Sequence, residues 1–199
     1  MLKLSTVNVF LTIKPKCEAD MEKRVKPLKS LSSINAIKDN IKNNPRDITL
    51  FTVGINSNIE LSDLLKIKIK SVEDIEPGNY LEIVEEKSNA VRRVNLTKSC
   101  IDLINTLLFA MIPYSSEDYL FQNKNGGPIT VQSVSKLIKK WCWEAGLTEV
   151  YSGSTLRKTW GYFQGKTYNI KIETLQICLN HSSLQETRDY LCLENESKT

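Results

Sequence analysis

Apolar residues recur at helical spacing once residue 28 is passed. Ile34, Ile37 and Ile41 lie three and four positions apart, which predicts one face of a helix capped by Ser30 or Ser32. The same period, bounded by capping residues, proline or glycine, predicts seven further helices. These are expected near residues 46–54, 61–65, 97–112, 131–145, 155–165, 172–179 and 184–193.

The middle of the chain follows a strand pattern instead. Lysine and isoleucine alternate from Lys66 to Lys70, as they do in a half-buried strand. Residues 80–84 and 91–96 flank a polar tip at Ser88 and Asn89, which predicts a hairpin. We therefore expect an α+β fold that is mainly α with a small antiparallel β-sheet of about three strands.

The first 27 residues differ from the rest of the chain. Lys14, Lys16, Lys23, Arg24 and Lys26 are interspersed with two prolines, a composition typical of a basic arm or linker. A frayed terminus explains the same composition equally well. The predicted division is an N-terminal basic arm over residues 1–27 and one domain over residues 28–199.

Composition places the chain among ordinary globular proteins. Its 199 residues are 41% apolar and 25% charged, which suits a single packed domain. The longest apolar stretch, residues 103–112, is too short to span a bilayer, and residues 7–13 lack the basic leader of a signal peptide. We expect no membrane association and a cytoplasmic location.

Cysteine and histidine content limits the possible chemistry. The five cysteines form no C-x-x-C pair, and an odd number of them is typical of reduced thiols. His181 is the one histidine, which excludes the H-E-x-x-H metalloproteases. No metal site is therefore expected. The net charge of +4 permits nucleic-acid binding without arguing for it.

The most informative segments are residues 152–161 and 179–190. The first reads S-G-S-T-L-R-K-T-W-G, and the second reads L-N-H-S-S-L-Q-E-T-R-D-Y. The second segment places His181 at the beginning of a predicted helix and Tyr190 nine residues later. Taken alone, each of these residues is more often structural than catalytic.

Together these segments resemble the catalytic domain of the tyrosine recombinases, the phage-integrase family. Residues 47–68 resemble the first catalytic block, in which an Arg precedes a run like the S-D-L-L seen here. Residues 153–161 resemble the H-x-x-R block, residues 179–190 the L-G-H-S-S block with its tyrosine, and residues 80–96 the family's hairpin. The resemblance covers residues 28–193 and implies a compact member with the catalytic domain alone.

The resemblance implies a reaction on double-stranded DNA. In this family a tyrosine hydroxyl attacks a phosphodiester and forms a 3′-phosphotyrosyl link. Two Arg side chains grip the phosphate oxygens, a Lys protonates the leaving oxygen, and two His assist. The family uses no metal or nucleotide cofactor, so none is expected here.

Four residues of this chain match the family's catalytic residues and two do not. The matching residues are Lys87, Arg157, His181 and Tyr190. Glu60 stands where the first Arg belongs, and Ser154 stands where the first His belongs. A carboxylate repels the phosphate that the Arg would grip, and a serine cannot shuttle a proton near neutral pH.

These two departures leave three hypotheses. The first is a DNA-binding protein of this family with impaired strand cleavage. The second is an active integrase in which Arg46, Lys66 or a partner subunit restores the missing charge. The third is a decayed prophage or mobile-element product without a retained role.

DNA contacts are predicted for cations near the matching blocks. The residues concerned are Lys66, Lys68, Arg92, Arg93 and Lys158. Residues 191–199 follow the tyrosine, and by resemblance this segment docks on a second copy of the chain, although packing on its own core is equally plausible. The resemblance also implies a nucleoid-associated protein from a prophage or mobile element.

Overall fold

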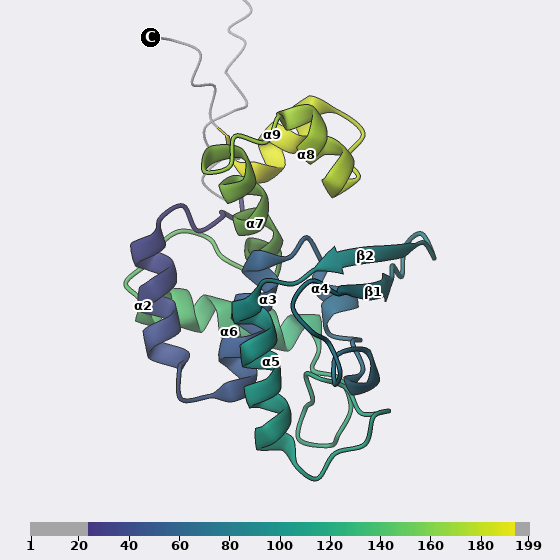
Figure 1. Ribbon diagram of the computed structural model, residues 1–199. Helices are drawn as coiled ribbons and strands as arrows, with labels where there is room; N and C mark the ends of the chain where they lie inside the picture. The colour runs from purple at the N-terminus through teal and green to yellow at the C-terminus, as the bar shows by residue number, and fades with distance from the viewer. Residues whose placement is uncertain (1–23, 194–199) are drawn as a thin grey trace, which may run out of the picture.

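The structure, a computed structural model, describes residues 24–193 (Figure 1). Residues 1–23 of the predicted arm and residues 194–199 of the predicted docking segment lie outside this range. Eight α-helices, one short 3-10 helix and two strands occur within it. In chain order they are α2 (Leu31–Ile41), α3 (Pro45–Asn56), α4 (Leu61–Leu64), η1 (Ile69–Ser71), β1 (Tyr80–Val84), β2 (Val91–Asn95), α5 (Lys98–Met111), α6 (Val131–Glu144), α7 (Ser154–Lys166), α8 (Ile172–Leu179) and α9 (Leu184–Leu191).

Local capping chemistry explains where most helices begin. Side-chain oxygens of the residues before α2, α3, α5, α6 and α9 accept a hydrogen bond from a main-chain N–H three residues later. These caps are Ser30, Asn44, Thr97, Thr130 and Ser183. The helices predicted from periodicity and capping are all present, with ends that differ from the expected ends by three residues at most.

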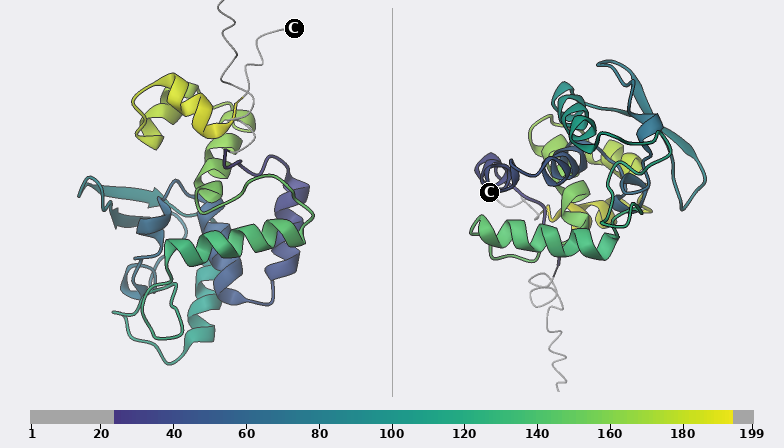
Figure 2. Two further views of the ribbon diagram at one scale, coloured as in Figure 1. Left: turned by 180° about the vertical axis from the view of Figure 1, so that it is seen from behind. Right: turned by 90° about the horizontal axis from the view of Figure 1, so that it is seen from below.

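The core is built around α3, which is buried along nearly its whole length. Helices α5 and α7 pack against it, and α6 crosses behind (Figure 2). Phe51 on α3 meets the edge of Trp141 on α6, with ring centroids 6.1 Å apart. A Cβ at Gly54 would lie 2.5 Å from the Leu156 side chain, so glycine permits the close approach of α3 and α7. This contact fixes the position of α7, which carries Ser154 and Arg157.

The sheet has two strands in the described residues, not three. β1 and β2 pair antiparallel, with Tyr80 opposite Asn95 and Val84 opposite Val91. The predicted strand at residues 66–70 is wrong. Ile67 and Ile69 are buried as the alternation requires, but the segment bonds to the loop at residues 116–120 and turns into η1 after a single bridge between Lys68 and Tyr119.

Helices α8 and α9 form a separate small unit at the end of α7 (Figure 1). Their own cluster of buried residues contains Leu175, Leu179 and Leu191, apart from the main core. Asn180 ends α8 in the left-handed conformation, with φ of 57°. The turn that follows carries His181, and α9 carries Tyr190, so this small unit presents both residues to the rest of the protein.

Candidate active site

Four separate segments bring the six family positions together. Glu60 precedes α4, Lys87 lies in the hairpin turn, Ser154 and Arg157 lie in the first turn of α7, and the unit of α8 and α9 supplies the other two, His181 and Tyr190. Glu60, Ser154, Arg157 and Tyr190 line one cavity of about 250 Å³. The residues that the sequence singled out thus share one site.

The carboxylate of Glu60 lies between two cations of this site. Arg157 Nη1 donates to Glu60 Oε2 at 2.8 Å, and Lys87 Nζ donates to Glu60 Oε1 at 3.2 Å. The Arg157 side chain is 14% exposed and that of Glu60 is 37% exposed, so the first pair is partly shielded from water. The side chain of Lys87 is 79% exposed, which makes the second pair weak.

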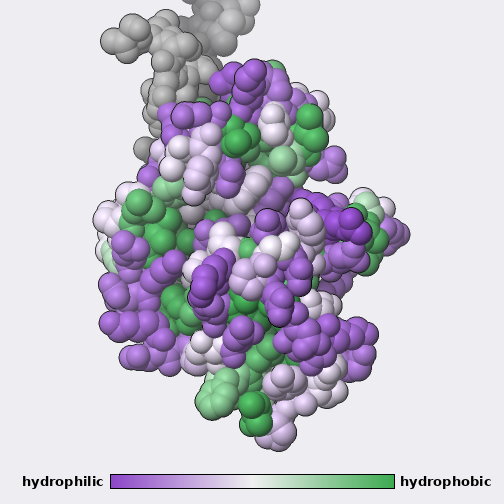
Figure 3. All heavy atoms as spheres, in the orientation of Figure 1, coloured by the Kyte–Doolittle hydropathy of each residue, from purple (hydrophilic) through white to green (hydrophobic). Residues whose placement is uncertain are grey.

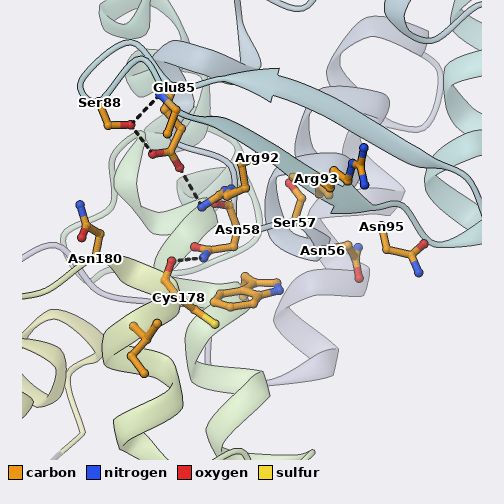
Figure 4. A pocket seen from close by; sticks show the side chains of 14 residues that line it. Asn56, Ser57, Asn58, Glu85, Ser88, Arg92, Arg93, Asn95, Cys178 and Asn180 are labelled. Atoms are coloured by element: carbon orange, nitrogen blue, oxygen red, sulfur yellow. Dashed lines mark hydrogen bonds and ion pairs between the residues drawn. The ribbon is translucent and has the colours of Figure 1, made fainter.

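Asn58 connects three elements around Arg157. Its side-chain oxygen accepts from Arg157 Nε at 2.9 Å, and its amide donates to the main-chain oxygen of Cys178 on α8. Its own main-chain oxygen accepts from Arg92 on β2. Figure 4 shows Asn58 with Arg92 and Cys178 at one wall of a second cavity, of about 550 Å³, between the hairpin and α8. Asn58 therefore ties the hairpin, α7 and α8 to one point.

His181 and Tyr190 face each other across the turn between α8 and α9. Their rings meet edge to face, with centroids 4.8 Å apart. His181 Nδ1 lies 3.1 Å from the hydroxyl oxygen of Thr187 on α9. Burial lowers the pKa of His181 below its ordinary value, and Arg157 and Lys158 lower it further. The neutral imidazole is therefore favoured beside Tyr190.

The Tyr190 phenol is held in its neutral form. Burial raises the pKa of Tyr190, and the charge of Glu60 raises it further. The Arg157 guanidinium opposes both effects through its charge and a hydrogen bond to the phenol. Glu60 therefore opposes ionisation of the Tyr190 phenol.

Lys158 lies in the interior, although a DNA contact was predicted for it. It is 7% exposed, and its Nζ donates to the main-chain oxygen of Tyr190 at 2.7 Å. The same ammonium lies 4.5 Å from the centroid of the Tyr190 ring. A phosphate contact by Lys158 would require the ammonium to leave Tyr190.

The other predicted DNA-contacting cations each face a carboxylate on the hairpin side of the molecule. The pairs are Lys66 with Glu86 at 2.7 Å, Lys68 with Glu117 at 2.8 Å, Arg92 with Glu85 at 3.1 Å and Arg93 with Glu82 at 3.0 Å. Hydrophilic side chains cover most of this region (Figure 3). The hairpin side is therefore polar but not strongly positive.

Both residues of this chain that were proposed to replace the missing Arg already have partners. Arg46 donates to Asp47 Oδ1 at 2.8 Å and to the main-chain oxygen of Gln122, and Lys66 is held by Glu86 as described above. Ser154 faces a neighbouring hydroxyl, that of Ser152, at 3.3 Å. Among the residues that line the cavity of about 250 Å³, the cation is Arg157.

Two features that bear on this site were missed from the sequence. Asn58 was treated only as part of a break between helices, and its side-chain partners lie 99 and 120 residues away in the chain. The glutamates that pair with the hairpin cations were not considered. Three of them, Glu82, Glu85 and Glu86, lie on one arm of the predicted hairpin opposite Arg92 and Arg93 on the other, which is a visible signal of compensated charge.

Across residues 24–193, no three His, Cys, Asp or Glu side chains gather in a way that could hold a metal ion. None of the helices in that part of the chain has both the length and the apolar character needed to cross a membrane.

Comparisons with known proteins bear on the family and the fold of this chain. Residues 22–196 match the Phage integrase family. The chain is 31% identical over 176 residues to the "Probable integrase/recombinase YoeC" of Bacillus subtilis, a match that covers 87% of this chain and 92% of that protein. It is 29% identical over 168 residues to tyrosine recombinase XerH of Campylobacter jejuni, covering 82% of this chain and 46% of XerH. The chain thus spans nearly all of YoeC but less than half of XerH.

Solved structures share the fold. The crystal structure of XerA recombinase superposes with a TM-score of 0.70 at 18% identity, covering 86% of this chain and 62% of that one. XerH bound to palindromic difH substrate, in a post-cleavage complex, gives 0.66 at 22% identity, covering 83% and 48%. At these identities the likeness establishes the arrangement of helices and hairpin, and the function depends on the site itself.

Proposed function

Since this chain belongs to the phage integrase family of tyrosine recombinases, we propose that it is a DNA-binding member with impaired strand cleavage. The observation that carries this proposal is the Glu60 carboxylate between Arg157 and Lys87. In the family, the corresponding space receives a DNA phosphate gripped by two Arg. Here the protein's own anion takes the place of the phosphate and neutralises the remaining Arg.

The size of the effect can be estimated from charge. During cleavage the phosphate gains negative charge, and a unit charge about 4 Å away at an effective dielectric of about 20 interacts by roughly 4 kcal/mol. Replacing a cation by an anion changes the interaction by about twice that amount before relaxation. Even half of the total corresponds to roughly a thousandfold in rate. Ser154 adds a smaller loss because a hydroxyl cannot transfer protons near neutral pH.

The partner in this proposal is double-stranded DNA. XerA and XerH are named as recombinases, and the XerH structure is a complex with its difH substrate. Another similar structure is a lambda integrase dimer bound to a core site. A second copy of this chain bound on the same DNA, through the C-terminal segment after α9, belongs to the proposal, although Leu191 itself packs on the chain's own core. So does a cellular role near the nucleoid, with an origin in a mobile element.

A nicked duplex tests the cleavage part of the proposal. Because the target sequence is unknown, the probe is a pool of duplexes with randomised sequence, each carrying one nick, and covalent adducts are counted on a denaturing gel. The unaltered protein should give adduct at the level of Tyr190→Phe. Glu60→Arg should raise the adduct rate by at least about a hundredfold, because it restores a cation at the phosphate.

The matched control is Glu82→Arg, which makes the same charge change at an exposed pair on the hairpin. It should leave the adduct rate unchanged, and Tyr190→Phe in the Glu60→Arg background should remove the adduct. Rapid adduct formation by the unaltered protein would contradict the proposal.

The active-recombinase hypothesis has its own support, namely the gathering of Lys87, Arg157, His181 and Tyr190 at one site. The nicked-duplex assay distinguishes an active recombinase from a protein that binds DNA without cutting it.

The third hypothesis, a decayed product without a role, is tested by retention of labelled duplex over a range of salt concentrations. A protein that uses phosphate contacts loses DNA steeply as salt rises.

A further inference from the structure

Lys158 is a buried cation for which the cleavage chemistry of the family supplies no role. It is 7% exposed, and no ion pair among residues 24–193 includes it. Lysine is almost never so deeply buried unless it is paired. Its position on α7 next to Arg157 therefore calls for an explanation from its surroundings.

The Lys158 ammonium contacts both the main chain and the side chain of Tyr190. Lys158 Nζ donates to the main-chain oxygen of Tyr190 at 2.7 Å, and it lies 4.5 Å from the centroid of the Tyr190 ring. Tyr190 is in the last turn of α9, where main-chain oxygens carry partial negative charge and attract cations. One ammonium thus fixes both the main chain and the ring of Tyr190.

We propose that Lys158 is a positioning residue that holds Tyr190 in the site and favours the ionised form of its phenol. A positive charge close to an ionisable hydroxyl stabilises the negative form, and the face of a phenolate ring is more electron-rich than that of a phenol. The proposal rests on the proposed function only in identifying Tyr190 with the family's nucleophile.

Other charged groups act on the same pair. Arg157 favours the phenolate and Glu60 opposes it, while His181 packs against the ring and lies closer to neutrality than usual. Burial lowers the pKa of Lys158, Arg24 and Lys26 lower it further, and Cys192 acts in the opposite direction. The ammonium of Lys158 lies over the face of the ring, so removing its charge should change the reactivity of the phenol.

Nitration of tyrosine by tetranitromethane provides the readout, because the reagent attacks the phenolate. Tyr190 lines the cavity of about 250 Å³, which gives the reagent access, and Tyr168, 66% exposed, serves as an internal reference. The rates are measured at pH 8 without DNA, by mass spectrometry of the peptides. Lys158→Met should lower the ratio of Tyr190 to Tyr168 nitration about tenfold, equal to one pKa unit.

Two variants separate charge from packing. Lys158→Arg keeps a cation and should retain the ratio to within about twofold, since a guanidinium also stacks on aromatic faces. Lys139→Met removes an exposed lysine from α6 and should leave the ratio unchanged. If Lys158 only caps α9, the folded Lys158→Met protein loosens Tyr190 and the ratio stays equal or rises, which overturns the proposal.

The unaltered protein gives a second test, which is needed if Lys158→Met does not fold. While Lys158 is charged, the logarithm of the Tyr190 rate should rise by about one per pH unit, and it should flatten where Lys158 loses its proton. The Tyr168 rate should show no such step. Parallel profiles for the two tyrosines would overturn the proposal. Because DNA is absent from these assays, their failure leaves the cleavage proposal untouched, and a failed cleavage assay leaves this one untouched.

Discussion

The two sides of the site are stabilised in different ways. On the hairpin side, cations are paired with carboxylates, as in Lys87 with Glu60 and Arg93 with Glu82. On the side of α8 and α9, Tyr190 is held by an aromatic edge, a buried ammonium and apolar packing. To bind phosphates, the cations of the hairpin side would have to release their carboxylate partners. On the side of α8 and α9, the groups that contact Tyr190 need no such change of partner.

Under the proposed function, gripping a phosphate and positioning a nucleophile would be separable properties of the fold. The Glu60 carboxylate pairs with Arg157, which still keeps its bonds to Asn58 and to the main-chain oxygen of Leu179, and Glu60 acts on Tyr190 only by raising the pKa of its phenol. The tyrosine side depends on the docking of α9 on α7. The comparison therefore predicts that the two sides respond to different substitutions.

The largest expected effect is the loss of α9 docking. Leu191 is fully buried, and it lies against Gly161 on α7, where a Cβ would come within 2.6 Å. Leu191→Ala should lower the free energy of unfolding by about 2–5 kcal/mol, because it removes buried methyl groups and leaves a cavity. Urea denaturation followed by circular dichroism measures this loss.

Leu193→Ala is the matched control, since Leu193 is only partly buried beside the same cluster. It should lose less than half as much stability as Leu191→Ala. If Leu191→Ala lowers the free energy of unfolding by less than about 1 kcal/mol, α9 is not held by packing, and the contrast drawn with the hairpin side is wrong.

A smaller effect is expected from releasing paired cations on the hairpin side. Glu117 receives Lys68 at 2.8 Å and Lys70 at 2.7 Å, and these hydrogen bonds lower the pKa of Glu117 to about 2. Glu117→Gln should free both lysines for phosphates and raise affinity for random duplex DNA about tenfold at 0.1 M salt. Fluorescence anisotropy over a salt series should give a slope steeper by up to about 1.8.

Asp102→Asn frees one exposed lysine, Lys98, on α5 and serves as the comparison. If both variants raise the affinity for DNA equally, the affinity depends on the net charge of the protein and not on cations of the hairpin side. No gain from Glu117→Gln would contradict a DNA contact by Lys68.

The sequence predicted the features of this molecule that depend on near neighbours. Helix beginnings follow from caps such as Thr97 and Ser183, whose partners lie three residues away. The strand at residues 66–70 was predicted wrongly because its alternation was real but its partner was a loop. An alternating pattern reports burial on one face and says nothing about which segment completes the hydrogen bonds.

The site was predictable where a motif fixes residue identity, and less so where contacts are distant. The family pattern predicted a site that includes Arg157, Tyr190 and Glu60, and the structure places these three residues around one cavity. The burial of Lys158 could not be deduced, because it depends on α9 docking 32 residues later in the chain. Asn58 was missed for the same reason, since its partners come from α7 and α8.

The smallest expected effect concerns the protonation of His181. Burial lowers its pKa in the folded protein below the ordinary value of 6.5, so the unfolded chain binds the proton more tightly. Stability should therefore be complete above about pH 6.5 and should fall as the pH drops through this value toward the folded pKa. Because the chain contains 1 histidine, urea midpoints between about pH 5.5 and 7.5 report on His181 with little interference from carboxylates.

The control variant is His181→Gln, which should flatten the dependence of the urea midpoint on pH while leaving the Glu60 and Arg157 pair in place. An unchanged slope in His181→Gln would show that the imidazole is solvated as well as in the unfolded chain, and that the tyrosine side of the site is more open than its packing indicates.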